Sequence, residues 1–118
     1  MLQKKYFNGV RILSINKKEI EKRMKKIIKK IKADKNVINI IAFGSFFSEE
    51  FNPRSDIDIA IILKKSDKNF IERADDFIDY FNELKVDVNI IVYTQKEFNK
   101  MLKEKNNFIL KINEGKIL

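Results

Sequence analysis

The chain has 118 residues, a length that fits one domain with an ordinary hydrophobic core. It contains no cysteine and no histidine, which excludes a disulfide framework, a thiolate zinc site and catalysis by a Ser-His or Cys-His pair. The 25 basic and 17 acidic residues give a formal net charge of +8, which favours polyanionic partners such as nucleotides, nucleic acid or an acidic protein.

The first half of the chain predicts a hairpin, a helix and a buried strand. An Asn8-Gly9 pair indicates the hairpin turn. Residues 17–33 carry isoleucine and methionine at helical spacing among many lysines, and Asn16 is the expected N-cap. Residues 37–43 are an apolar run too short for a helix of its own, which predicts a buried strand.

The second half predicts two more strands and further helices. Residues 56–63 and 86–93 are the strands, and the short connection back to residues 37–43 favours antiparallel or mixed pairing of the first two strands. Residues 70–81 form the clearest amphipathic stripe and are expected to be a helix that faces the core. The stripe consists of Phe70, Ile71, Ala74, Phe77, Ile78 and Phe81.

The C-terminal part predicts a capped helix, a further helical segment and an edge strand. Thr94 and Glu97 have the spacing of a capping box. Residues 108–112 suggest another turn or two of helix, and residues 117–118 can pair at a sheet edge. The whole order predicts one α/β (α+β) domain over residues 1–118, a small mixed central sheet flanked by helices.

The distribution of apolar residues gives an expectation for the compartment. No apolar run approaches the roughly 20 residues that span a bilayer, and no signal peptide is visible behind the N-terminal lysines. We therefore expect a cytoplasmic protein without a membrane partner.

Three aspartates are the candidate catalytic and metal-binding residues. Side chains alternate along a strand, so Asp56 and Asp58 share one face, about 7 Å apart. A divalent cation would relieve their repulsion, and an oxygen-only ligand set suits Mg²⁺. If the strand over residues 86–93 lies alongside, Asp87 completes a triad around two metal ions and can accept a proton from an attacking hydroxyl.

A Gly44-Ser45 pair follows the first strand of the predicted sheet. Glycine allows the backbone to approach a ligand closely, and the serine hydroxyl and nearby N–H groups can hold phosphate oxygens where a short helix over residues 46–51 begins. Gly44 and Ser45 are therefore the candidate nucleotide-binding residues.

Gly44-Ser45, ten intervening residues and then Asp56-Ile57-Asp58 resemble the signature of the polymerase-β-type nucleotidyltransferase superfamily. In its short length the chain is similar to the minimal nucleotidyltransferases of bacteria and archaea. The resemblance covers residues 37–93 and includes Ser55 before the first aspartate. It implies that Asp56, Asp58 and, by its place on the following strand, Asp87 bind Mg²⁺, while Gly44 and Ser45 hold the triphosphate, with ATP the expected substrate.

The resemblance also implies a partner and a biological role. Minimal nucleotidyltransferases are frequently encoded beside a helical HEPN-type protein, and in such pairs the transferase resembles an antitoxin that adenylylates a tyrosine of a HEPN ribonuclease. One departure concerns the arginine that many members carry soon after the glycine-serine pair, where this chain has Phe46 and Phe47. The corresponding phosphate contact is absent here or is supplied by Arg54 or Lys64.

Two other classes of function remain open from the sequence. The protein could neutralise a HEPN-type partner by occlusion with an idle site, since an Asp-x-Asp pair alone is often only two solvent-facing charges on a strand. It could also be a basic nucleic-acid-binding domain that uses the lysine face of the first helix. A solvated helix face is the preferred interpretation of those lysines, because arginine and interleaved aromatic residues are absent there.

Overall fold

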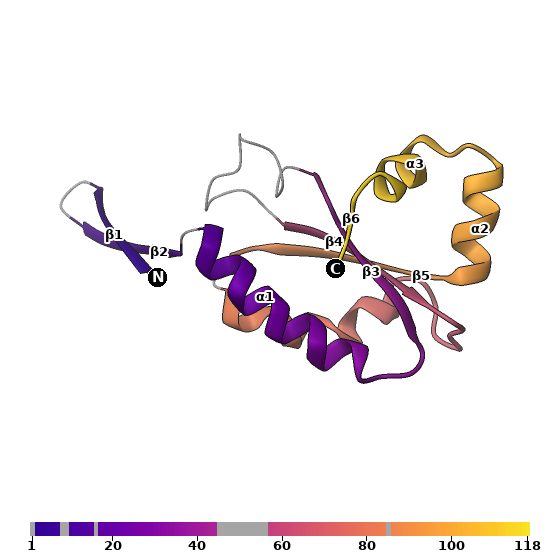
Figure 1. The fold of residues 1–118 in the computed structure, drawn as a ribbon, viewed down its shortest axis with the longest axis horizontal. Helices are drawn as coiled ribbons and strands as arrows, with labels where there is room; N and C mark the ends of the chain where they lie inside the picture. The colour runs from indigo at the N-terminus through magenta and orange to yellow at the C-terminus, as the bar shows by residue number, and fades with distance from the viewer. Residues whose placement is uncertain (1, 8–9, 16, 45–56, 85) are drawn as a thin grey trace.

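The computed structural model describes residues 2–7, 10–15, 17–44, 57–84 and 86–118 (Figure 1). The elements in chain order are β1 (Leu2–Phe7), β2 (Val10–Ile15), α1 (Lys17–Lys32), β3 (Val37–Phe43), β4 (Ile57–Leu63), the 3₁₀ helices η2 (Glu72–Asp76) and η3 (Ile78–Leu84), β5 (Val88–Thr94), α2 (Gln95–Lys103), α3 (Asn107–Asn113) and β6 (Lys116–Ile117). No described helix is long and apolar enough to cross a membrane.

The main sheet has four strands in the order β5-β4-β3-β6. Strand β3 is antiparallel to both β4 and β6, whereas β4 and β5 run parallel. The sheet is therefore mixed, as predicted, and the antiparallel pairing of β3 with β4 and the edge position of the C-terminal strand are also confirmed. Strands β1 and β2 form a separate antiparallel hairpin, whose predicted Asn8-Gly9 turn lies outside the described residues.

Strand β4 is buried on both faces, because helical segments cover each side of the sheet (Figure 1). Ile57, Ile59 and Ile61 belong to a core that contains the apolar face of α1 and residues of η3. Ala60 and Ile62 belong to a second core, with side chains from α2 and α3. Asp58 is the one residue of β4 that is not fully buried, so its polar side chain stands out within an apolar strand.

The amphipathic stripe over residues 70–81 does not form the predicted α-helix. The chain winds there into the two short 3₁₀ helices η2 and η3, and only part of the stripe reaches the core. Phe77 and Phe81 are buried, but Ile71 is 83% exposed and Phe70 and Ile78 are also exposed. A 3₁₀ helix turns every three residues, so its apolar face is narrower than the stripe of an α-helix.

A buried arginine lies within this segment. Arg73, 7% exposed, is the buried polar residue among those described, and it lies within the segment that apolar spacing assigned to the core. Its Nη1 and Nη2 donate to the two carboxylate oxygens of Glu97, at 2.6 and 3.2 Å, and its Nε donates to the carbonyl of Lys68 at 3.0 Å. The interaction joins η2 to the start of α2.

The junction between β5 and α2 has the predicted capping box. The Thr94 hydroxyl accepts from the Glu97 backbone N–H, and the Glu97 carboxylate accepts from the Thr94 backbone N–H. Both hydrogen bonds satisfy donors that a helix N-terminus leaves without partners. They fix where β5 ends and α2 begins.

Candidate nucleotidyl-transfer site

Asp58 lies near the N-terminal end of β4, between two neighbouring strands. In the register of the sheet it stands opposite Phe43 on β3 and opposite Asn89 on β5. Because side chains alternate along a strand, Asp58 shares the face of Ala60 and Ile62, beyond the part that α2 and α3 cover with apolar side chains. The position explains why its carboxylate is only half-buried.

Gly44 comes directly after β3 and lies against the Asp58 carboxylate. Its φ is 80°, in the left-handed region, and a Cβ built on it would stand 2.5 Å from Asp58 Oδ2. Any other residue at this position would be strained and would displace the carboxylate. The Gly44 backbone therefore closely approaches Asp58, whereas its predicted approach to a nucleotide stays a prediction.

Asn89 is a site residue that the sequence analysis missed. Its Nδ2 donates to Asp58 Oδ1 at 3.1 Å, so the carboxylate is oriented by an amide from the adjacent strand. Strand alternation from Asp87 puts Asn89 on the same face, but only the parallel register of β4 and β5 shows that it stands directly opposite Asp58. The sequence alone therefore could not identify Asn89 as a neighbour of Asp58, because that requires the pairing of β4 with β5.

Asp87 precedes β5 and is exposed. Its backbone carbonyl accepts from the N–H of Ile57 at 2.9 Å, which extends the parallel pairing of β4 and β5 to this residue. Asp87 has the same parity as Asn89 and stands two residues, about 6–7 Å, before it along the chain, because each residue of an extended chain rises about 3.3 Å. The expected condition for Asp87, that its strand lies beside the Asp58 strand, is fulfilled.

The other sequence candidates lie outside the described residues. These are Ser45 and Asp56, together with Phe46, Phe47 and Arg54. Of the site predicted from the sequence, the described chain thus brings together Gly44 and Asp58, while Asp87 lies just before the adjacent strand β5 with its backbone carbonyl bonded to Ile57. Among the residues described, no three His, Cys, Asp or Glu side chains are grouped so as to hold a metal ion.

The donor set nevertheless fits a hard divalent cation. Asp58 and Asp87 supply only oxygen, which is what Mg²⁺ prefers. Gly44 leaves room beside Asp58 Oδ2 that a Cβ would fill, and Asn89 occupies the other carboxylate oxygen. Asp58 Oδ2 is thus the oxygen best placed to bind a cation or a nearby phosphate-bound metal.

The protein is thus an α/β domain with a mixed sheet flanked by helices. Its candidate site contains a carboxylate held between a glycine turn and an amide, an arrangement suited to metal-assisted phosphate chemistry. The chain belongs to the nucleotidyltransferase domain family, whose model matches residues 17–113. The match includes α1, the whole four-stranded sheet except β6, and all the candidate site residues.

A solved structure has the same fold. It is that of a Sulfolobus solfataricus protein provisionally named a nucleotidyltransferase, determined at 1.40 Å resolution. The two chains are 22% identical, with a TM-score of 0.56 over 71% of this chain and 75% of the other. Comparison with curated proteins gives no significant match. The minimal nucleotidyltransferase assignment and its fold are therefore confirmed.

Proposed function

We propose that the protein transfers AMP from ATP, with Mg²⁺, to an acceptor hydroxyl. The single observation that carries this proposal is the Asp58 carboxylate, held between the Gly44 backbone and the Asn89 amide. Metal-assisted transfer requires a carboxylate that is oriented and accessible, as this one is near the end of an otherwise apolar strand.

The proposed reaction is an in-line displacement at the α-phosphorus. The acceptor oxygen forms a bond to that phosphorus, the bond from phosphorus to the oxygen bridging to the β-phosphate breaks, and pyrophosphate leaves with the electron pair. Asp87 accepts the hydroxyl proton, and Gly44 and Ser45 hold the triphosphate. Bound Mg²⁺, which Asp56, Asp58 and Asp87 would hold, neutralises charge on the attacking and leaving oxygens.

We further propose that the acceptor is a tyrosine of a HEPN-type helical protein and that the transfer makes this chain an antitoxin. The support is the resemblance of the Gly44-Ser45 and Asp56-x-Asp58 pattern to minimal nucleotidyltransferases. The net charge of +8 is also compatible with an acidic partner surface. The alternative is occlusion of the same partner by an idle site.

Label transfer from α-³²P-ATP to a HEPN-type protein encoded beside this chain tests the proposal. We expect Mg²⁺-dependent labelling by the wild type and loss of it, by about 10³-fold or more, in Asp58→Asn. Asp79→Asn, an exposed acid on η3, is the matched control and should label normally. Phenylalanine substitutions in the partner identify the tyrosine.

Neutralisation of the partner separates the two alternatives. If Asp58→Asn forms the complex and still silences the partner, the protein acts by occlusion and the transfer proposal is wrong. If labelled AMP appears on nucleic acid or on a small molecule, the transfer chemistry holds but the HEPN acceptor is wrong.

A further inference from the structure

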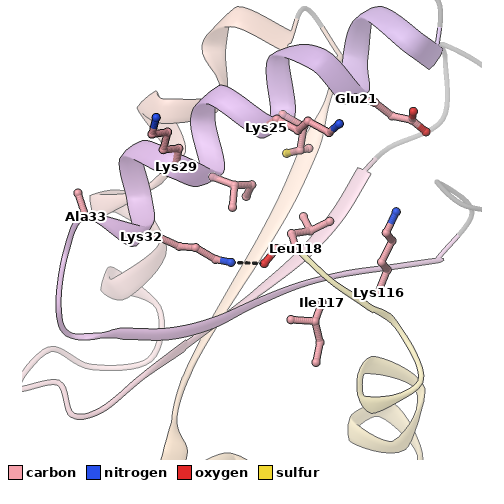
Figure 2. A pocket seen from close by; sticks show the side chains of 10 residues that line it. Glu21, Lys25, Lys29, Lys32, Ala33, Lys116, Ile117 and Leu118 are labelled. Atoms are coloured by element: carbon pink, nitrogen blue, oxygen red, sulfur yellow. Dashed lines mark hydrogen bonds between the residues drawn. The ribbon is translucent and has the colours of Figure 1, made fainter.

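A groove lies away from the candidate site, between α1 and the C-terminal strand β6 (Figure 2). It is open and has a volume of about 690 Å³. Its apolar lining includes Met24 and Ile28, which are 3% and 6% exposed, together with Leu118 and the 64% exposed Ile117 from the C-terminal segment. A groove of this volume is within the range of roughly 300–1,000 Å³ found for binding sites.

Lysines surround this apolar lining. Lys25, Lys29 and Lys32 line the groove from α1 and Lys116 lines it from β6, whereas Glu21 is the one acidic residue of the lining (Figure 2). Lys32 donates from Nζ to the carbonyl oxygen of Leu118, which ties the helix to the C-terminal segment across the groove.

Lys25 and Lys29 stand one helical turn apart on α1, and Glu21 stands one turn before Lys25. Lys25 and Lys29 are both exposed, and neither forms an ion pair with a described acidic side chain. Like charges one helical turn apart, such as Lys25 and Lys29, destabilise a helix slightly. An occupant with acidic groups on its flank would remove this repulsion.

The apolar lining and the surrounding lysines together indicate which kind of molecule could bind in the groove. A second copy of the chain is disfavoured, because each copy carries a net charge of +8 and would present lysines to lysines. Nucleic acid would engage the lysines through phosphates but would leave the apolar lining unused. A molecule with an apolar stripe and acidic flanks would contact both the apolar lining and the lysines.

The spacing along α1 points to a helix as that occupant. Met24 and Ile28 are one turn apart, as are Lys25 and Lys29, so the apolar lining and the lysines repeat together every four residues. A helix laid alongside presents its own side chains at the same interval, which is how ridges on one helix fit the grooves beside another.

We propose that the groove between α1 and β6 is a docking site for an amphipathic helix of a partner protein, with an apolar stripe flanked by Asp or Glu. This inference does not depend on nucleotidyl transfer, because no candidate site residue lines the groove.

A designed peptide provides the probe. We would measure fluorescence anisotropy of a synthetic helical peptide with leucine at i, i+4 and i+7 and glutamate on both flanks, at physiological salt. Lys25→Glu/Lys29→Glu should weaken binding about tenfold or more, because the charges around the apolar lining become repulsive. Lys22→Glu/Lys26→Glu is the matched control, with the same change of net charge on residues of α1 that line a different surface, beside Asn82 and Glu83. It should weaken binding less than about threefold, as expected for long-range attraction alone.

Three results would overturn the proposal. Equal weakening by the two double variants would mean that only the overall charge attracts the peptide. Equal binding of a peptide in which serine replaces every leucine would mean that the apolar lining is not used. Sedimentation with phosphatidylglycerol vesicles that depends on Lys25 and Lys29, without peptide binding, would assign the groove to a lipid surface instead.

Discussion

At the scale of single residues, the substitution Gly44→Ala should separate the catalytic geometry from the fold. A Cβ at this position would stand 2.5 Å from Asp58 Oδ2, and the φ of 80° adds strain, so the carboxylate has to move. A displacement of about 1 Å in a catalytic group costs on the order of 100-fold in rate, and we expect label transfer to fall by that factor.

Gly115→Ala is the control for this prediction. Its Cβ would stand 2.6 Å from the carbonyl oxygen of Ala42, so it causes a clash of similar severity that is directed at the β3 backbone and not at the Asp58 carboxylate. Thermal unfolding should show destabilisation of both variants, while transfer at a temperature where both are folded should fall only in Gly44→Ala. A normal rate in Gly44→Ala would show that the glycine is needed only for folding.

Asn89 gives a second prediction at the residue scale. Asn89→Leu removes the amide that donates to Asp58 Oδ1, so the carboxylate loses its orientation although both strands remain intact. Groups that orient metal ligands typically contribute 10–100-fold to metal affinity, and we expect Mn²⁺ binding, measured by electron paramagnetic resonance, to weaken by about that factor.

The comparison variant for Asn89 is Asn99→Leu. Asn99 lies on α2, which follows the opposite end of β5, and its side chain accepts a hydrogen bond from Gln95. This variant should bind Mn²⁺ normally. Unchanged metal affinity in Asn89→Leu, with a normal unfolding temperature, would contradict a positioning role for the amide.

At the scale of elements, the ion pair between Arg73 and Glu97 predicts how stability depends on pH. The hydrogen bond from Arg73, followed by those from Thr94, lowers the pKa of Glu97 below its usual range. A carboxyl whose pKa is lower in the folded state stabilises the fold above the unfolded pKa, about 4.3, and this contribution is lost as the pH falls through the folded value.

Glu97→Gln should remove that acid-dependent contribution. Because the Glu97 side chain is 41% exposed, solvent screens the pair, and we expect a loss of only about 1 kcal/mol at pH 7, which shrinks as the pH falls below the unfolded pKa of about 4.3 and disappears below the lowered folded pKa. Urea unfolding at several pH values measures this. Glu104→Gln, exposed at the C-terminal end of the same helix, should follow the wild type, and a constant difference between Glu97→Gln and the wild type at all pH values would contradict the pKa argument.

The same elements show which parts of the fold can be predicted from the sequence. The strands β3, β4 and β5 were predictable because each is an apolar run of a length typical of strands, and the capping box at Thr94 because its signal is local. The winding of residues 70–81 was not, since apolar spacing alone does not distinguish an α-helix from two 3₁₀ helices. The hydrogen-bond partner of the Arg73 guanidinium is Glu97, 24 residues away in the sequence, and no local sequence pattern predicts that contact.

The candidate site, too, is only partly predictable from the sequence. Gly44, Asp58 and Asp87 could be proposed from residue type and strand alternation, because both operate within one segment. Asn89 could not, because its relation to Asp58 depends on the register between two strands. Register is decided by the packing of whole faces, here Ile57, Ile59 and Ile61 against α1 and η3, and packing is a property of the folded chain.

At the scale of the whole molecule, β4 joins two cores, and this predicts a single cooperative unfolding transition. Ile59 belongs to the core under α1 and Ile62 to the core under α2 and α3, both with exposures of 1% or less. Ile59 and Ile62 are three residues apart on the same strand, so they cannot leave their cores independently. Unfolding of either core therefore disrupts β4, on which the other core depends.

Ile59→Ala and Ile62→Ala should therefore each lower the free energy of unfolding by about 2–5 kcal/mol without splitting the transition. Ile71→Ala is the matched control, since the same side chain is 83% exposed in η2's N-cap position, and its cost should be within about 0.5 kcal/mol. Urea unfolding is followed by circular dichroism and by tyrosine fluorescence, with Tyr6→Phe and Tyr80→Phe in the background so that the fluorescence reports Tyr93 in the second core. Coincident curves in all three variants are expected. An Ile62→Ala curve in which the tyrosine signal changes before the circular dichroism would mean that α2 and α3 unfold separately, and that the sheet carrying Asp58 holds together without them.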